Sequence, residues 1–264
     1  MRIIHYSFDD NRSVTMKGFI SEPIEGIAST DCRPAVLILP GGGYDRISSR
    51  EGEPIALKYL SKGFNAFVLS YPVKTSMPEV IKACAWAMAT IRNLAEVHHI
   101  NPKKVAVCGF SAGAHLAGMI STLKDGEVNL KTHKNIPLVP DACVLCYPVI
   151  DGGEYAHKGS FDNICVKESD KEAYSIQNRI TESAPPAFIW STASDETVPV
   201  QNSLLAAKAF ADNGVPFELH IFESGKHGLA ACEWQTAHDE SEIKPECSEW
   251  FELSVKFLEK YLNK

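Results

Sequence analysis

The chain has 264 residues, of which 45% are hydrophobic and 22% are charged, and its formal net charge at pH 7 is −7. This length and composition are typical of one large soluble domain, which we expect to span residues 1–264. The negative charge argues against nucleic acid and anionic membrane surfaces as partners, so we expect a small-molecule substrate and leave a homo-oligomer open.

The first residues, MRIIHYSFDD, contain no apolar run long enough for a signal peptide. No stretch of the chain approaches the length of a membrane span. We therefore expect a cytoplasmic protein whose eight cysteines are reduced. Cys143 and Cys146 form a CxxC pair, but the pair lies in an apolar run and no second pair follows. This context favours buried structural cysteines over a zinc or redox site, and we expect neither a metal ion nor a cofactor.

In chain order, the first predicted elements are two strands, IIHYSF and TMKGFI, which we expect to pair antiparallel at one edge of a sheet. Short continuous apolar runs follow, as expected for strands buried on both faces. These runs are residues 34–40, 64–70, 104–109, 142–148, 187–192 and 217–222. Helical patterns lie at about 51–62, 79–98, 112–123, 201–213 and 247–262. The alternation predicts an α/β fold with a mainly parallel, eight-stranded sheet and helices on both faces.

Two segments interrupt this alternation. Residues 151–184 are polar and contain glycines, and residues 229–246 are acidic and irregular. Both follow the ends of strands, where α/β folds place their ligands. We interpret 151–184 as a possible small cap insertion, and 229–246 as either a pocket rim or a surface loop.

The pentapeptide GFSAG at 109–113 joins a predicted strand to a predicted helix. A Gly-x-Ser-x-Gly turn between a strand and a helix is typical of a nucleophile elbow, in which small flanking residues prevent clashes. The Ser111 hydroxyl would then lie at a helix N-terminus, whose partial positive charge favours a developing anion. Ser111 is therefore the candidate nucleophile.

A serine hydroxyl needs a base to remove its proton, and the candidate base is His227. It lies in a glycine-flanked loop directly after the last predicted strand. His238 is the competing candidate, whereas His220 lies inside the strand. His115 is in the elbow helix itself, where we expect it to pack or form local hydrogen bonds.

An orienting carboxylate is expected between the serine and the histidine in the sequence. Asp195 follows the predicted strand 187–192, and the order Ser, Asp, His is the one used by a nucleophile elbow on this architecture. Asp195 can also be interpreted as an ordinary turn aspartate, and Glu196 is its neighbouring competitor.

The run LPGGGY ends a predicted strand with Gly41, Gly42 and Gly43. Consecutive glycines let backbone N–H groups turn toward one point and let a substrate approach closely. One or two of them, together with the N–H of Ala112, would form an oxyanion hole. A phosphate-binding loop is disfavoured because neither the Walker spacing nor Gly-x-Gly-x-x-Gly is present.

Four stretches, LPGGGY, GFSAGAHLA, STASDETVPV and GKHGL, together resemble the α/β-hydrolase superfamily. They are most similar to small bacterial lipases/esterases related to acetyl-xylan esterases and described as xylanase-B-like, and the resemblance covers roughly 34–262. It implies that Ser111, His227 and Asp195 form a catalytic triad, and that Gly42, Gly43 and Ala112 supply the oxyanion N–H groups. Relatives of hormone-sensitive lipase usually carry a histidine before the glycines, where this chain has Pro40.

The expected activity is hydrolysis of short-acyl, chiefly acetyl, esters of sugars or oligosaccharides through an acyl-enzyme, without a cofactor. A short acyl group is expected because no long apolar cap segment is available for a fatty chain. Tyr44, Tyr155 and Trp234 are candidates for the substrate pocket because aromatic faces pack against sugar rings and apolar groups. Two alternatives stay open: an amide hydrolase with the same triad, such as an arylformamidase or a small peptidase, and a non-catalytic binding protein on the same scaffold.

Overall fold

The structure is a computed structural model that describes residues 1–8, 11–130, 133 and 135–262. Eight strands form one sheet in the order β1-β2-β4-β3-β5-β6-β7-β8. The strands are β1 (Arg2–Phe8), β2 (Asn11–Ile20), β3 (Arg33–Leu39), β4 (Asn65–Ser70), β5 (Ile100–Phe110), β6 (Ala142–Cys146), β7 (Ala187–Thr192) and β8 (Phe217–Phe222). β1 pairs antiparallel with β2, and β2 pairs antiparallel with β4, whereas all other pairs are parallel. The predicted eight-stranded, mainly parallel sheet is confirmed.

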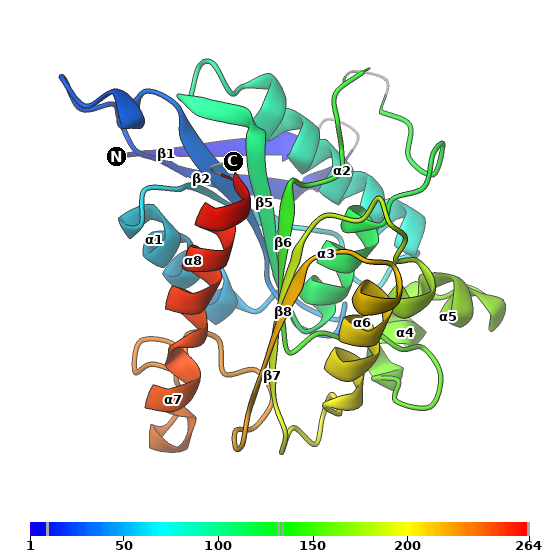
Figure 1. Ribbon diagram of the computed structural model, residues 1–264. Helices are drawn as coiled ribbons and strands as arrows, with labels where there is room; N and C mark the ends of the chain where they lie inside the picture. The colour runs from blue at the N-terminus through cyan, green and yellow to red at the C-terminus, as the bar shows by residue number, and fades with distance from the viewer. Residues whose placement is uncertain (9–10, 131–132, 134, 263–264) are drawn as a thin grey trace.

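Helices cover both faces of this sheet (Figure 1). The helices are α1 (Glu53–Ser61), α2 (Met77–Asn93), α3 (Ala112–Ser121), α4 (Lys158–Ile164), α5 (Ser169–Tyr174), α6 (Gln201–Asp212), α7 (Pro245–Ser248) and α8 (Trp250–Leu262). α1 and α8 lie on one face, and α2, α3 and α6 lie on the other. The central parallel strands β3, β5, β6 and β7 are largely buried on both faces, which explains their apolar runs, whereas the edge strand β8 is only partly buried.

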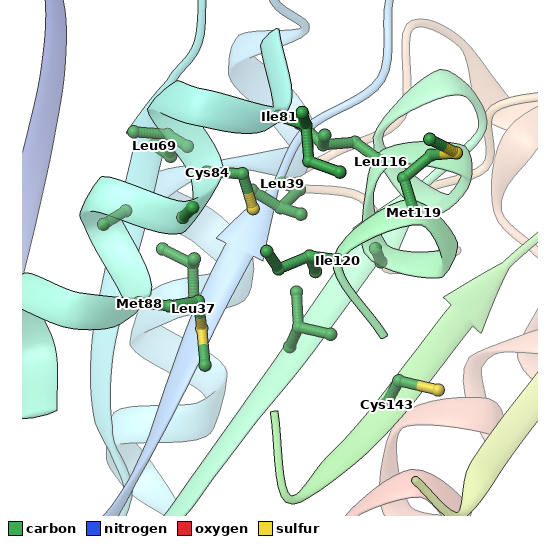
Figure 2. Packing of buried hydrophobic residues seen from close by; sticks show 14 of the residues in the cluster. Leu37, Leu39, Leu69, Ile81, Cys84, Met88, Leu116, Met119, Ile120 and Cys143 are labelled. Atoms are coloured by element: carbon green, nitrogen blue, oxygen red, sulfur yellow. The ribbon is translucent and has the colours of Figure 1, made fainter. Parts of the chain in front are cut away.

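The larger core cluster lies between the sheet and helices α2 and α3 (Figure 2). Leu37 and Leu39 of β3 pack there with Ile81 of α2 and Leu116 of α3. Every residue of α3 is buried, so this helix is held on all sides and its N-terminus has a fixed position. Burying one such leucine or isoleucine side chain contributes about 1.5–3 kcal/mol.

The boundaries differ from the prediction where polar residues extend or interrupt an element. β5 begins at Ile100 rather than 104, because the polar residues 101–104 continue the strand. The helix predicted at 79–98 begins at Met77 and ends at Asn93. The helix predicted at 247–262 is divided into α7 and α8. The segment 151–184 contains two short helices, α4 and α5, that the sequence pattern did not predict.

The CxxC pair lies within β6, where Cys143 and Cys146 are both fully buried, as their apolar context predicted. Cys143 packs in the cluster beside α2 and α3, and Cys146 packs in the cluster on the opposite face. Side chains three residues apart on a strand point to opposite faces, so these two thiols cannot share a ligand or a disulfide.

Within the described ranges, none of the helices combines the length and the hydrophobicity needed to cross a bilayer. The same residues contain no group of three or more His, Cys, Asp or Glu side chains arranged to hold a metal ion.

Candidate active site

Ser111 lies in the turn between the end of β5 and the start of α3, with φ 53° and ψ −117°. A positive φ is unfavourable for a residue with a Cβ atom, and such strain costs about 1–3 kcal/mol. The surrounding backbone holds the turn: the Ser111 N–H donates to the Cys146 carbonyl at 3.0 Å, and the Ser111 carbonyl accepts from Ala114 and His115 at 3.0 Å each. The hydroxyl is thereby fixed at the carboxyl edge of the sheet.

The two glycines of the pentapeptide are required by close approaches of the backbone. A Cβ atom on Gly113 would lie 2.0 Å from the Leu39 carbonyl oxygen of β3. A Cβ atom on Gly109 would lie 2.2 Å from the Gly113 carbonyl oxygen. Real Cβ contacts are never this short, so α3 can approach β3 and β5 only because these positions carry no side chain.

His227 and Asp195 meet Ser111 at the same edge. The His227 Nε2 lies 2.7 Å from the Ser111 Oγ, and the His227 Nδ1 lies 2.6 Å from the Asp195 Oδ2. A carboxylate accepts, so Nδ1 carries the proton and Nε2 is free to accept from the serine hydroxyl. This arrangement prepares the imidazole to remove the proton of Ser111.

The second oxygen of the Asp195 carboxylate is fixed by hydrogen bonds from the backbone. Its Oδ1 accepts from the backbone N–H groups of Thr197 and Val198 at 2.9 Å each. The Asp195 side chain is 1% exposed and that of His227 is 15% exposed, so the pair is shielded from water. The competing Glu196 is exposed, and His238 contacts Glu242 through its backbone N–H instead of entering this chain of contacts.

The glycine loop follows β3 beside the serine. Gly42 has φ 124° and Gly43 has φ 66°, and a Cβ atom on Gly42 would lie 2.2 Å from the Arg46 carbonyl oxygen. Within the described part of the chain, the N–H groups of Gly42, Gly43 and Ala112 donate to no protein acceptor. Gly41 differs, because its N–H donates to the Glu51 Oε2 at 2.7 Å. Three N–H groups therefore stay available for a bound oxyanion.

Glu51 is a buried carboxylate that sequence reasoning missed. Its Oε2 holds Gly41, and its Oε1 accepts from the Tyr147 hydroxyl at 2.7 Å. The Tyr147 hydroxyl also accepts from the Ala230 N–H at 3.0 Å, and its ring packs edge-on against His227 at 5.1 Å. Burial raises the pKa of Tyr147 well above its usual value, so the hydroxyl keeps its proton and donates. Glu51 thus connects the glycine loop to the loop that carries His227.

Gly42, Gly43, Glu51, Ser111 and His227 line a cavity of about 930 Å³. Its walls come from the segment 42–51, from residues 157–163 and from residues 226–242. The lining side chains are almost all polar, and Ile47 is the only large apolar one among them. The segments 151–184 and 229–246 therefore both contribute to the pocket wall.

One rim of this pocket is held by ionic contacts around Glu242. This buried carboxylate contacts Arg50, accepts from the His238 N–H at 2.9 Å and lies 3.0 Å from the Lys226 Nζ. Burial works to raise the pKa of Glu242, but these three donors outweigh it and lower the pKa. Arg50 also donates to the Thr236 carbonyl at 2.8 Å. The irregular segment after the base is thus anchored beside the pocket.

None of the three aromatic candidates for the pocket lines this cavity, which corrects the prediction. Tyr44 is fully buried, and its hydroxyl lies 2.8 Å from the Nδ1 of His115 in α3. Tyr155 is half-buried at the start of the 151–184 segment, whereas Trp234 is 78% exposed on the protein surface. Tyr44 directly follows the glycines in a turn where its φ is 57°, and its ring packs into the core instead of the pocket.

His115 is a neutral link between the elbow helix and its neighbours. Its Nε2 lies 2.8 Å from the Tyr174 carbonyl, which can only accept, so Nδ1 accepts from the Tyr44 hydroxyl. Burial lowers the pKa of His115 to about 4, the hydrogen bond to Tyr174 opposes this shift, and the charge of Arg179 adds to it.

The His115 pKa predicts a specific loss of stability in acid. The folded-state pKa of about 4 lies below the ordinary histidine pKa of 6.5, so between these pH values the unfolded chain binds more protons than the folded protein. His115 should therefore remove about 2 kcal/mol from the free energy of unfolding between pH 7 and pH 4.5. Urea unfolding at both values should show a smaller pH-dependent loss for His115→Gln than for the wild type. Equal losses in the two proteins would contradict this assignment.

A comparison with protein families identifies the scaffold. The BD-FAE family model matches residues 27–210, which is more than half of the chain. The chain belongs to the BD-FAE family of α/β-hydrolases. The resemblance to the α/β-hydrolases noted in the sequence is therefore confirmed.

Individual relatives of this BD-FAE chain agree with the family match. The chain is 35% identical over 222 residues to endo-1,4-beta-xylanase B of Butyrivibrio fibrisolvens, covering 80% of this chain and 35% of that protein. It is 33% identical over 216 residues to an acetylxylan esterase of Xylanibacter ruminicola, covering 78% of this chain and 43% of that protein. The aligned part thus spans less than half the length of both curated relatives.

A solved structure covers this BD-FAE chain almost completely. It is an acetyl ester-xyloside bifunctional hydrolase from Caldicellulosiruptor lactoaceticus, with a TM-score of 0.83 and 34% sequence identity. The match covers 94% of this chain and 88% of that one. The fold that this chain shares with the solved structure therefore extends beyond residues 27–210.

Proposed function

We propose that this protein is a serine carboxylesterase that hydrolyses short-acyl esters of sugars through an acyl-enzyme. The chain of contacts from Ser111 through His227 to Asp195 carries this proposal, since it joins a nucleophile, a base and an orienting acid at a pocket wall. Relatives of similar sequence include proteins named as an acetylxylan esterase and an acetyl ester-xyloside hydrolase.

In the proposed reaction, His227 removes the proton of Ser111 as Oγ attacks the ester carbonyl carbon. The carbonyl oxygen becomes negative and accepts hydrogen bonds from the N–H groups of Gly42, Gly43 and Ala112. His227 then gives its proton to the leaving alcohol oxygen. A water molecule, deprotonated by His227, attacks the acyl carbon. His227 returns this proton to the Ser111 Oγ as the bond between Oγ and the acyl carbon breaks, and the carboxylic acid is released.

The composition of the pocket wall supports a polar alcohol part. A cavity of about 930 Å³ is much larger than an acetyl group, and its walls carry Arg46, Lys226 and Asn163 among other polar side chains. Hydroxyl groups of a sugar find donors and acceptors there, whereas Ile47 is the only large apolar side chain of the wall that could contact a long acyl chain.

A series of p-nitrophenyl esters from acetate to octanoate tests the acyl preference of the wild-type protein. We expect kcat/KM for octanoate not to exceed that for acetate, because the added methylenes find few apolar side chains to contact in the pocket wall. Acetylated xylo-oligosaccharide and N-formylkynurenine, assayed in parallel, separate ester from amide hydrolysis. Faster turnover of octanoate or of N-formylkynurenine would contradict the proposal.

A further inference from the structure

His157 lies in the pocket wall but has no role in the reaction described above. It precedes α4, within the segment 151–184, and lines the same cavity as Gly43, Ser111 and His227. Its Cε1 would lie 3.7 Å from a Cβ atom on Gly43, which places the ring beside the glycine loop. The ring therefore lies within reach of a molecule bound at Ser111.

The tautomer of His157 follows from its contacts with Ser160. The Ser160 backbone N–H lies 3.2 Å from the His157 Nδ1, and the Ser160 Oγ lies 2.8 Å from the same atom. The Ser160 N–H is shared, since it also donates to the His157 backbone carbonyl at 3.0 Å. Because a backbone N–H can only donate, its second contact assigns Nδ1 as an unprotonated acceptor that caps α4. A neutral imidazole with an unprotonated Nδ1 carries its proton on Nε2.

The charge state of the ring agrees with this assignment. Burial, followed by the neighbouring His227, lowers the pKa of His157, and Asp195 opposes the shift. His157 therefore stays neutral at pH 7 and keeps its Nδ1 lone pair for Ser160.

The Nε2–H of His157 is left without an acceptor among the residues that the structure describes, although the ring is only half-buried in the cavity wall. We propose that His157 is a substrate-binding residue whose Nε2–H donates a hydrogen bond to an oxygen of the bound sugar ester. This inference rests on the proposed function, because the acceptor is an oxygen of that substrate. The competing explanation is that His157 serves only as the N-cap of α4.

Two substitutions separate these roles. In His157→Asn the side-chain oxygen takes the place of Nδ1 and can cap α4, but the donor at the Nε2 position is lost. In His157→Gln the amide nitrogen takes the place of Nε2 and can still donate, but the capping acceptor is lost. His157→Asn therefore keeps the contact that caps α4 and loses the donor to the substrate, and His157→Gln does the reverse.

We expect His157→Asn to lower kcat/KM by about 10-fold with little change in Tm, because one hydrogen bond to the substrate is lost. His157→Gln should keep most of the wild-type kcat/KM and lose some Tm. If only acetylated xylo-oligosaccharide is affected, the acceptor is a sugar oxygen. If p-nitrophenyl acetate is affected equally, the acceptor is an oxygen of the ester group.

The opposite pattern, with His157→Asn like the wild type and His157→Gln impaired, would overturn the proposal in favour of a capping role alone. Equal effects of both substitutions on kcat/KM, or no effect of either, would overturn it as well. These outcomes are distinct from failure of the proposed function, in which the wild-type protein itself would turn over no ester.

The tautomer provides a test that needs no turnover. Nitrogen-15 NMR of the histidine side chains at pH 7 should show the His157 ring protonated on Nε2 and unprotonated on Nδ1, with His157→Gln used for assignment. A proton on Nδ1 would contradict the proposal even in an active enzyme.

Discussion

Ser111→Ala is expected to lower kcat/KM for p-nitrophenyl acetate by about 10⁴-fold or more, because the reaction then loses its nucleophile. His227 and Asp195 alone can activate water only weakly in the absence of the serine oxygen. The backbone at position 111 keeps its hydrogen bonds to Cys146 and Ala114, so the Tm should change little. Steady-state kinetics and a thermal melt measure both quantities.

Ser121→Ala is the matched control for this substitution. Ser121 is a buried serine at the last position of the same helix, α3, and it does not line the pocket. Its replacement should leave kcat/KM within about 2-fold of the wild type, as expected for a site remote from the reaction. If Ser111→Ala kept more than a tenth of the wild-type rate, another residue would have to be the nucleophile.

Asp195→Asn is expected to produce the second largest effect, a fall of about 10³–10⁴-fold in kcat with a small change in KM. The amide oxygen can still accept from the N–H groups of Thr197 and Val198, so the local backbone should keep its position. The amide nitrogen then faces the His227 Nδ1 and can only donate to it. His227 is forced to carry its proton on Nε2, and it can no longer accept the proton of Ser111.

Glu196, the exposed neighbour of Asp195, provides a control for the loss of one negative charge. Glu196→Gln neutralises a carboxylate one residue away, but this side chain is exposed and takes no part in the contacts of His227. Its kcat should stay within about 2-fold of the wild type. Similar losses in Asp195→Asn and Glu196→Gln would show that net charge, and not the tautomer of His227, explains the effect.

The sheet could be predicted because its strands carry local signals. The run at 187–192 matches β7 residue for residue, since a strand buried on both faces contains mostly apolar residues. The run at 217–222 also matches β8 residue for residue, although this edge strand is only partly buried. β5 was predicted to begin four residues too late, because the polar start of this strand lacks an apolar pattern. The short helices α4 and α5 were missed for a similar reason, since neither has enough turns to show a helical period.

The positions of Ser111, Asp195 and His227 were also predictable, because each follows a strand and parallel strands end at one edge of the sheet. The pocket wall was not predictable in the same way. It depends on which residues of the segments 42–51 and 151–184 pack against this edge, and that is decided by long-range contacts. Tyr44 was expected in the wall, but its hydroxyl contacts His115 in the core.

Glu51 and Tyr147 could not be found from local patterns either. They are 96 positions apart in the sequence, and their hydrogen bond forms only when the loop after β3 packs against the end of β6. A buried glutamate in a predicted helix start is indistinguishable from an exposed one by sequence alone. The two carboxylate oxygens of Glu51 accept hydrogen bonds from Gly41 and Tyr147 only in the folded chain.

The reactivity of the Ser111 side chain tests the account most directly. The folded wild-type protein should react with a fluorophosphonate probe at one site, and peptide mass spectrometry should locate the label on Ser111. Asp195→Asn should react much more slowly, since its His227 cannot activate the hydroxyl. Absence of labelling in folded wild-type protein, or a label on a different serine, would contradict the assignment of Ser111 as the nucleophile.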